Sequence, residues 1–279
     1  MRRRKKYRTL ISVILSFFLA VAIFLIMFCS EMMMGYLGKR TFNDSMTESK
    51  YIESAIERMQ ADIIALLEEK SVSSEQAAVI IDTNRCYVEM KNYITGALEG
   101  KKVSIDATDF KMAMEDYLEA YLADNQIYKT EGVQSAMDEI VNQAGKIYVR
   151  SLQTEFAVTF YQFGAQIRLI MLITMVVAAV IGGVLGVILF LLYHYKHKAV
   201  RYMMISTTSA TIWNVVCGFF ISKIDVAKEL EVGPEYYLDF LRAYVNNGLG
   251  EWWIMSVIGV LLLMALYAIG KYLKHNAKR

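Results

Sequence analysis

The chain has 279 residues, of which 56% are apolar, and its formal net charge is only +2. This length is enough for one or two ordinary domains, and we expect no nucleic-acid partner. The single proline, Pro234, indicates long uninterrupted helices, because proline removes an amide donor and clashes with the preceding helical turn.

Four uncharged runs predict four transmembrane helices. A helix needs about 20 apolar residues to cross the hydrocarbon core of a bilayer. The predicted spans are residues 9–30, 169–193, 202–222 and 252–270, of which the third is the least apolar. The basic start of the chain would suit a signal peptide. However, the first run is too long for one and no small-residue cleavage site follows, so we expect a retained span.

Charge sets the orientation of these spans. The segments 1–8, 194–201 and 271–279 together hold 13 basic residues and no acidic one, whereas all 28 acidic residues fall in 31–168 and 223–251. Lys and Arg favour the cytoplasmic side. We therefore expect a multi-pass plasma-membrane protein, with both termini and the loop 194–201 in the cytoplasm and the two acidic segments outside.

Residues 31–168 predict an extracytoplasmic helical bundle inserted between spans one and two. Apolar residues recur at helical spacing from Ser45, from Ala78, from Phe110 and from Val133. No strand alternation or Asn-Gly hairpin signal occurs, so the predicted fold class is all-α, with four or five bundle helices. The last of these has no proline to stop it before span two. The clearest apolar stripe consists of Ile52, Ile56, Met59, Ile63 and Leu67.

Residues typical of catalysis are scarce. All three histidines, His194, His197 and His275, lie in predicted cytoplasmic segments. No HExxH, paired-cysteine or phosphate-binding glycine motif occurs, so we expect no enzyme activity, no cofactor and no metal site. His194 and His197 are spaced to share a helix face, but no Cys, Asp or Glu lies nearby to complete a metal site. A disulfide between Cys29 and Cys86 stays open as an alternative, although a helical domain does not need one.

Small and polar residues mark the faces on which spans two and three could pack or line a pore. Glycines four residues apart let helices approach closely, and hydroxyl and amide groups either line a polar pore or form hydrogen bonds in a packed bundle. No charged residue falls inside the predicted span boundaries, which argues against ion- or proton-coupled transport. The candidate residues are Gly182, Gly186, Thr207, Thr211, Asn214 and Gly218.

The two loops between spans carry further candidates. In the inner loop, Lys196, Lys198 and Arg201 could dock a cytoplasmic partner or lipid headgroups. The outer segment 223–251 predicts an aromatic helix that begins at Pro234 and ends at Asn246-Asn247-Gly248. This helix lies on the outer interface or docks against the outer domain. The candidate interfacial anchors are Tyr237, Phe240, Tyr244, Trp252 and Trp253.

Three stretches carry a family resemblance: HKAVRYMM before span three, GPEYYLDFLRAYVNN before span four and YIESAI in the outer domain. They resemble a group of uncharacterised four-span membrane proteins of Gram-positive bacteria, which implies the same topology and location and no activity. The layout is also similar to FtsX/MacB-type permeases, which couple a cytoplasmic ATPase to events outside the cell. Their glycine before span three is absent here.

The leading hypothesis is a non-enzymatic envelope protein whose outer domain is a binding, sensing or assembly module for a protein, peptide or wall component. A permease-like subunit of an ATPase complex is the alternative, and a channel or transporter is third. The expected partners are the lipid bilayer, a protein that binds the outer domain and a second copy of the chain.

Overall fold

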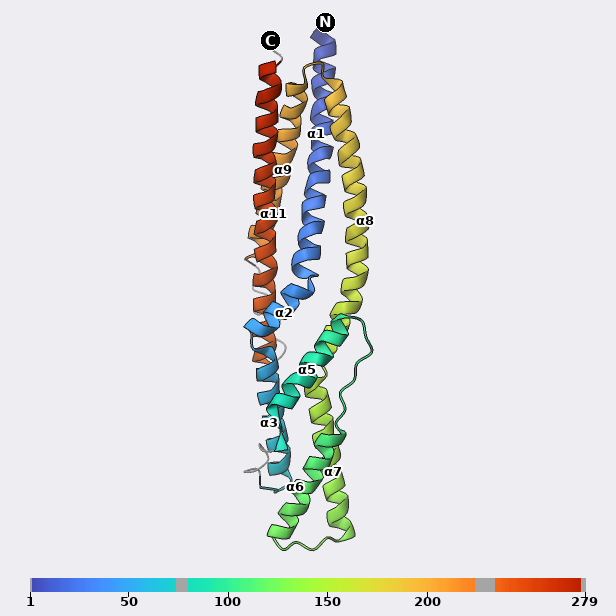
Figure 1. The fold of residues 1–279 in the computed structure, drawn as a ribbon, viewed down its shortest axis with the longest axis vertical. Helices are drawn as coiled ribbons and strands as arrows, with labels where there is room; N and C mark the ends of the chain where they lie inside the picture. Colours follow the sequence, from blue (N-terminus) through green and yellow to red (C-terminus); the bar gives the residue numbers. More distant parts are fainter. Residues whose placement is uncertain (1, 74–79, 224–233, 277–279) are drawn as a thin grey trace. The chain divides into compact units, whose positions relative to one another are not determined.

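The fold is built from helices (Figure 1). The computed structural model describes residues 2–73, 80–223 and 234–276, with side chains from residue 7 onward. No residue in these ranges belongs to a strand. The all-α prediction is therefore confirmed.

Four helices are long and apolar enough to cross a membrane, as predicted. Many of their side chains are apolar and exposed, which suits contact with lipid chains. On the second of these helices, for example, Leu169, Val180 and Leu191 are 59%, 62% and 70% exposed. The four are α1 (Arg2–Glu31) with its π-helical extension η1 (Met32–Tyr36), α8 (Glu155–Leu192), α9 (Lys196–Ile221) and α11 (Glu235–Asn276).

The chain divides into two compact units. The first, here called the apolar unit, consists of Met1–Ser45, Ala165–Gly233 and Leu241–Arg279. The second, here called the amphipathic unit, consists of Met46–Gly164 and Pro234–Phe240.

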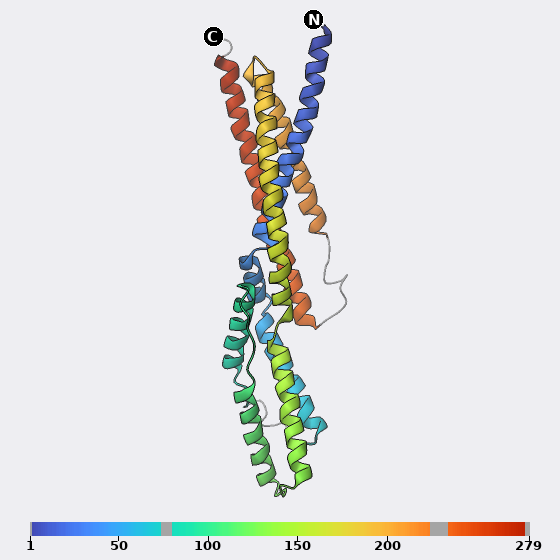
Figure 2. The same cartoon turned by 90° about the vertical axis from the view of Figure 1, so that its right-hand side faces the viewer.

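In the apolar unit, α1 and α9 lie side by side (Figures 1 and 2). Hydroxyl groups connect the chain segments of this unit. The Oγ atoms of Ser16 and Ser206 are 2.7 Å apart, and Ser12 Oγ lies 2.8 Å from the hydroxyl of Tyr193. Within a bilayer the hydrophobic effect does not favour helix–helix over helix–lipid contact, so small polar residues of this kind contribute to association.

The amphipathic unit is centred on α7 (Glu131–Leu152), which packs against α3 (Tyr51–Glu69), α5 (Thr83–Leu98) and α6 (Thr108–Asp124). All five residues of the stripe predicted on α3, from Ile52 to Leu67, are buried, with exposed fractions between 0% and 7%. The amphipathic pattern of the sequence therefore marks the core of this unit. One further helix of the described residues, α2 (Lys39–Glu48), precedes α3 in the chain.

A capping aspartate sets the start of α5. The carboxylate of Asp82 accepts a hydrogen bond from the backbone N–H of Arg85 at 3.1 Å, as N-cap residues do. Ile81 and Asp82 are not helical, and α5 begins directly after them at Thr83. Ala78 itself lies outside the described residues.

The helix predicted to run without a stop into span two is broken between α7 and α8. Gln153 has extended backbone angles, φ −86° and ψ 94°, and α8 begins at Glu155. The break has a packing reason, since Leu152 and Ala157 are both fully buried, at 0% exposure. In one continuous helix, positions five residues apart point about 140° away from each other.

The outer helix predicted to end at Asn246-Asn247-Gly248 continues to Asn276 as part of α11. In the apolar unit, the amide of Asn247 donates to Ser45 Oγ at 3.0 Å, and Gly248 contacts the ring of Tyr36 so closely that a Cβ would not fit. The glycine therefore permits a close approach and does not end the helix.

Candidate functional sites

The polar face predicted on α9 is buried inside the apolar unit. Thr207, Thr211, Asn214 and Gly218 are all buried. The two threonine hydroxyls donate to carbonyl groups one turn earlier on the same helix, at 3.0 and 2.9 Å. Gly218 lies against the indole of Trp252, and an added Cβ would come within 2.7 Å of that ring. These are contacts of helix packing.

Asn214 is the centre of a polar cluster in the apolar unit. Its Nδ2 donates to Glu31 Oε1 at 2.6 Å and to Ser256 Oγ at 3.1 Å. Trp252 Nε1 donates to the backbone carbonyl of Asn214 at 3.0 Å. The cluster joins α1, α9 and α11. It is buried, since Glu31 is 1% exposed and Asn214 and Trp252 are 0% exposed.

Glu31 is a candidate functional residue that the sequence did not reveal. The predicted first span ended at Ser30, but the helix continues, and the stretch able to cross a membrane runs from Tyr7 to Tyr36. One signal could have found it, since residues 32–38 are again uncharged, which leaves Glu31 as a single acid within a long apolar run. An ionisable residue in such a position is a functional candidate by default.

The two glycines predicted for helix packing lie on α8. Gly182 faces α1, where a Cβ would stand 3.5 Å from Ala22 and 3.8 Å from Leu19. Gly186 faces α9, where an added Cβ would stand 3.8 Å from the methyl group of Met203. Both spacings are ordinary van der Waals distances.

The basic residues of the predicted inner loop make local contacts. The ammonium group of Lys196 donates to the carbonyl of Phe190 at 3.0 Å, Lys198 lies 5.5 Å from the ring centre of Tyr195, and Arg201 is exposed. Throughout the described part of the chain, no group of three or more His, Cys, Asp or Glu residues is placed to hold a metal ion.

Two of the predicted aromatic anchors pack inside the amphipathic unit. The ring centre of Phe240 is 5.7 Å from that of Tyr51 and 5.3 Å from that of Phe156. Tyr237 lies 5.5 Å from Phe156. The beginning of α11 thus packs against α3 and the start of α8 in this unit.

The other three predicted anchors belong to the apolar unit and differ in exposure. Tyr244 packs against the rings of Tyr36 and Phe42 at 6.1 and 6.4 Å. Trp252 is fully buried, whereas Trp253 is 42% exposed. Of the adjacent tryptophans, only Trp253 therefore has the exposure that an interfacial anchor needs.

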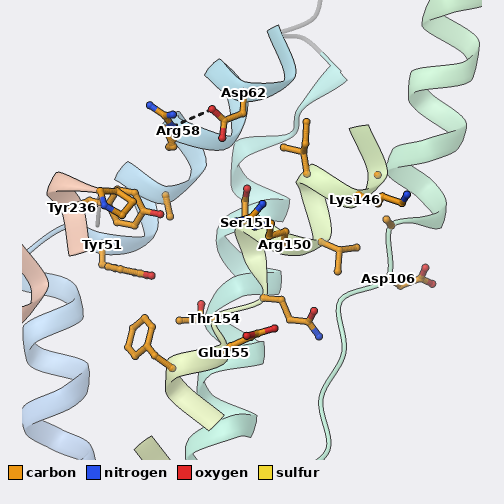
Figure 3. Close-up of a pocket in the computed structure, with 18 of the residues that line it drawn as sticks. Tyr51, Arg58, Asp62, Asp106, Lys146, Arg150, Ser151, Thr154, Glu155 and Tyr236 are labelled. Atoms are coloured by element: carbon orange, nitrogen blue, oxygen red, sulfur yellow. Dashed lines mark ion pairs between the residues drawn. The ribbon is translucent and has the colours of Figure 1, made fainter. Parts of the chain in front are cut away.

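The amphipathic unit contains a cavity of about 960 Å³ (Figure 3). Figure 3 shows Tyr51 and Tyr236 on one side of it and Lys146 and Asp106 on the other. The aromatic side is apolar, and burial raises the pKa of Tyr51, so its phenol stays neutral. The charged lining residues are Arg58, Asp62, Asp106, Lys111, Lys146, Arg150 and Glu155.

Some of these charges are already paired. Arg58 and Asp62 form an ion pair at 3.1 Å. Asp106 accepts hydrogen bonds from the hydroxyl and the N–H of Thr108, at 2.6 and 2.9 Å, and both hold the pKa of Asp106 below its usual value. The carboxylate of Asp106 is therefore ionised at neutral pH.

Other polar groups of the cavity are free to meet a ligand. Neither Lys146 nor Arg150 has an ion-pair partner among the described residues. The hydroxyl of Thr154, by contrast, is buried away from the cavity surface and has no hydrogen-bond partner among the described residues. Buried polar groups in folded proteins are nearly always paired. The accessible lining of the cavity therefore combines charges of both signs with an aromatic side.

No protein-family model, curated protein or solved structure matches this chain.

Proposed function

We propose that the chain is a plasma-membrane protein that crosses the bilayer four times and exposes its amphipathic unit outside the cell. Four helices of sufficient length and apolarity support the membrane location. The acid-free termini and the acid-free segment 194–201 support cytoplasmic placement of these parts. On this topology the described amphipathic unit is the main extracytoplasmic domain.

The function is the non-enzymatic binding of a peptide segment by this unit. The observation that carries the proposal is the cavity, which offers unpaired basic side chains beside ionised acids and an aromatic wall. A peptide presents the matching groups, since it has backbone donors and acceptors, charged side chains of either sign and apolar side chains. The segment would belong to another envelope protein or to a wall component.

Peptide binding is testable with purified full-length protein in detergent. The probes are fluorescent short peptides that combine an acidic, a basic and an aromatic side chain, and the measurement is fluorescence anisotropy. Arg150→Glu is expected to weaken binding by about tenfold or more, because a hydrogen bond to a charged group contributes about 1.5–3 kcal/mol. Ser151→Trp, which fills the cavity with an indole, is expected to block it.

The matched control is Lys91→Glu, which makes the same charge change on α5 at an exposed residue that does not line the cavity. It should leave the affinity unchanged. Equal affinity in the wild type, Arg150→Glu and Ser151→Trp would show that the cavity is not the binding site. Failure of every probe peptide to bind would contradict the peptide assignment.

A further inference from the structure

The polar cluster around Glu31 contains two buried oxygen atoms whose hydrogen-bonding capacity is not used. Glu31 Oε1 accepts a hydrogen bond from Asn214, but within the described part of the chain neither Glu31 Oε2 nor Asn214 Oδ1 has a hydrogen-bond partner. Both unpaired atoms are oxygens that accept hydrogen bonds. The cluster therefore lacks a positive group or a donor.

Nothing charged nearby offsets a negative charge on Glu31. No Lys, Arg or His nitrogen of the described residues lies within 4.0 Å of its carboxyl group. The titratable phenol of Tyr36 interacts with it electrostatically, and Glu251 of α11 lies near Gly35, one turn away. Neither neighbour carries positive charge. A buried carboxylate without a cation is strongly disfavoured.

We propose that Glu31 is a proton-binding site of the apolar unit, with the carboxyl group held as the neutral acid and oriented by Asn214. The bound proton removes the buried charge. It also supplies one donor to a cluster whose two unpaired atoms are both acceptors.

A proton suits this site better than a metal cation does. Hard cations take about six oxygen ligands. In the cluster, the unpaired side-chain oxygens of the described residues are only Glu31 Oε2 and Asn214 Oδ1. A single proton on one oxygen needs no such shell.

The position of the site gives proton binding a structural consequence. Glu31 is the last residue of α1, directly before the π-helical segment η1, and its partners come from α9 and α11. Short π-helical segments often occur at functional sites. Loss of the proton would place a negative charge where three helices meet. The packing of these helices therefore depends on whether Glu31 is protonated. Glu31 lies within the first stretch able to cross a membrane. The predicted absence of charged residues from the spans therefore no longer counts against a proton-coupled function.

The test is infrared spectroscopy of the full-length protein in lipid vesicles across a pH series in H₂O and D₂O. At neutral pH the wild type is expected to show a carboxylic-acid C=O band that shifts on deuteration. Glu31→Gln, which keeps the shape and replaces the acid with an amide, should lose this band while the helical amide signal is unchanged. The control Glu251→Gln, an acid of α11, should retain it.

Two outcomes would overturn the proposal. One is a wild-type spectrum at neutral pH that has no acid band distinguishing it from Glu31→Gln, because Glu31 would then be ionised. The other is an acid band that disappears when sodium chloride replaces choline chloride at constant pH, because a metal cation would then be the ligand.

Discussion

Replacing Trp252 with alanine is expected to lower the free energy of unfolding of the apolar unit by about 3–5 kcal/mol, as large buried aromatic truncations do. The indole is fully buried, lies 5.7 Å from the ring of Phe28 and fills the space above Gly218. The substitution also removes the hydrogen bond from Nε1 to the carbonyl of Asn214. Unfolding by sodium dodecyl sulfate in mixed micelles, followed by circular dichroism, measures the change.

The neighbouring tryptophan provides the control for this substitution. Trp253 is 42% exposed, so Trp253→Ala should change the free energy of unfolding by no more than about 0.5 kcal/mol. The two variants delete the same side chain at adjacent positions. The difference between their losses in free energy of unfolding therefore measures the effect of burial. Equal losses at the two positions would contradict the helix packing described for α9 and α11.

Asn214→Leu is expected to lower the free energy of unfolding by about 1–3 kcal/mol, because it leaves the buried Oε1 of Glu31 without its donor. Adding Glu31→Leu should restore most of the loss. When both members of a buried polar pair become apolar residues of similar size, the result is often neutral or stabilising. The same detergent titration on the two single variants and the double variant gives the coupling energy.

An exposed threonine on the same helix serves as the comparison. Thr208 donates only to the carbonyl of Met204 on its own helix, so Thr208→Val should change the stability by no more than about 0.5 kcal/mol. If the losses of Glu31→Leu and Asn214→Leu simply add in the double variant, the two residues do not act as a pair.

The sequence predicts the parts of this fold that depend on hydrophobic pattern. Uninterrupted apolar length marks the four candidate spans, and three- and four-residue spacing marks the stripe from Ile52 to Leu67 that forms the core of α3. The buried face of α9 could also be read from the spacing of Thr207, Thr211 and Asn214. Each of these patterns is local, so the chain alone contains it.

The features that the sequence does not show depend on residues far apart in the chain. In the sequence, Gly248 resembles the end of a helix, whereas in the structure it allows the ring of Tyr36 to approach the helix closely. Glu31 looks like the first residue of a solvated segment until Asn214, 183 positions later, is found as its donor. The cavity likewise combines α3, the end of α7 and Tyr236. These three features depend on tertiary contacts, which the hydrophobic periodicity of the sequence does not encode.

The measurement that tests the account most directly is cysteine labelling of the four-span topology. In a background where Cys29, Cys86 and Cys217 are alanine, single cysteines replace Lys91 in the amphipathic unit and the exposed Lys198 in the first turn of α9. A membrane-impermeant maleimide is expected to label Lys91→Cys in intact cells and Lys198→Cys only after the membrane is permeabilised. Labelling of Lys198→Cys in intact cells, with Lys91→Cys protected until permeabilisation, would contradict it.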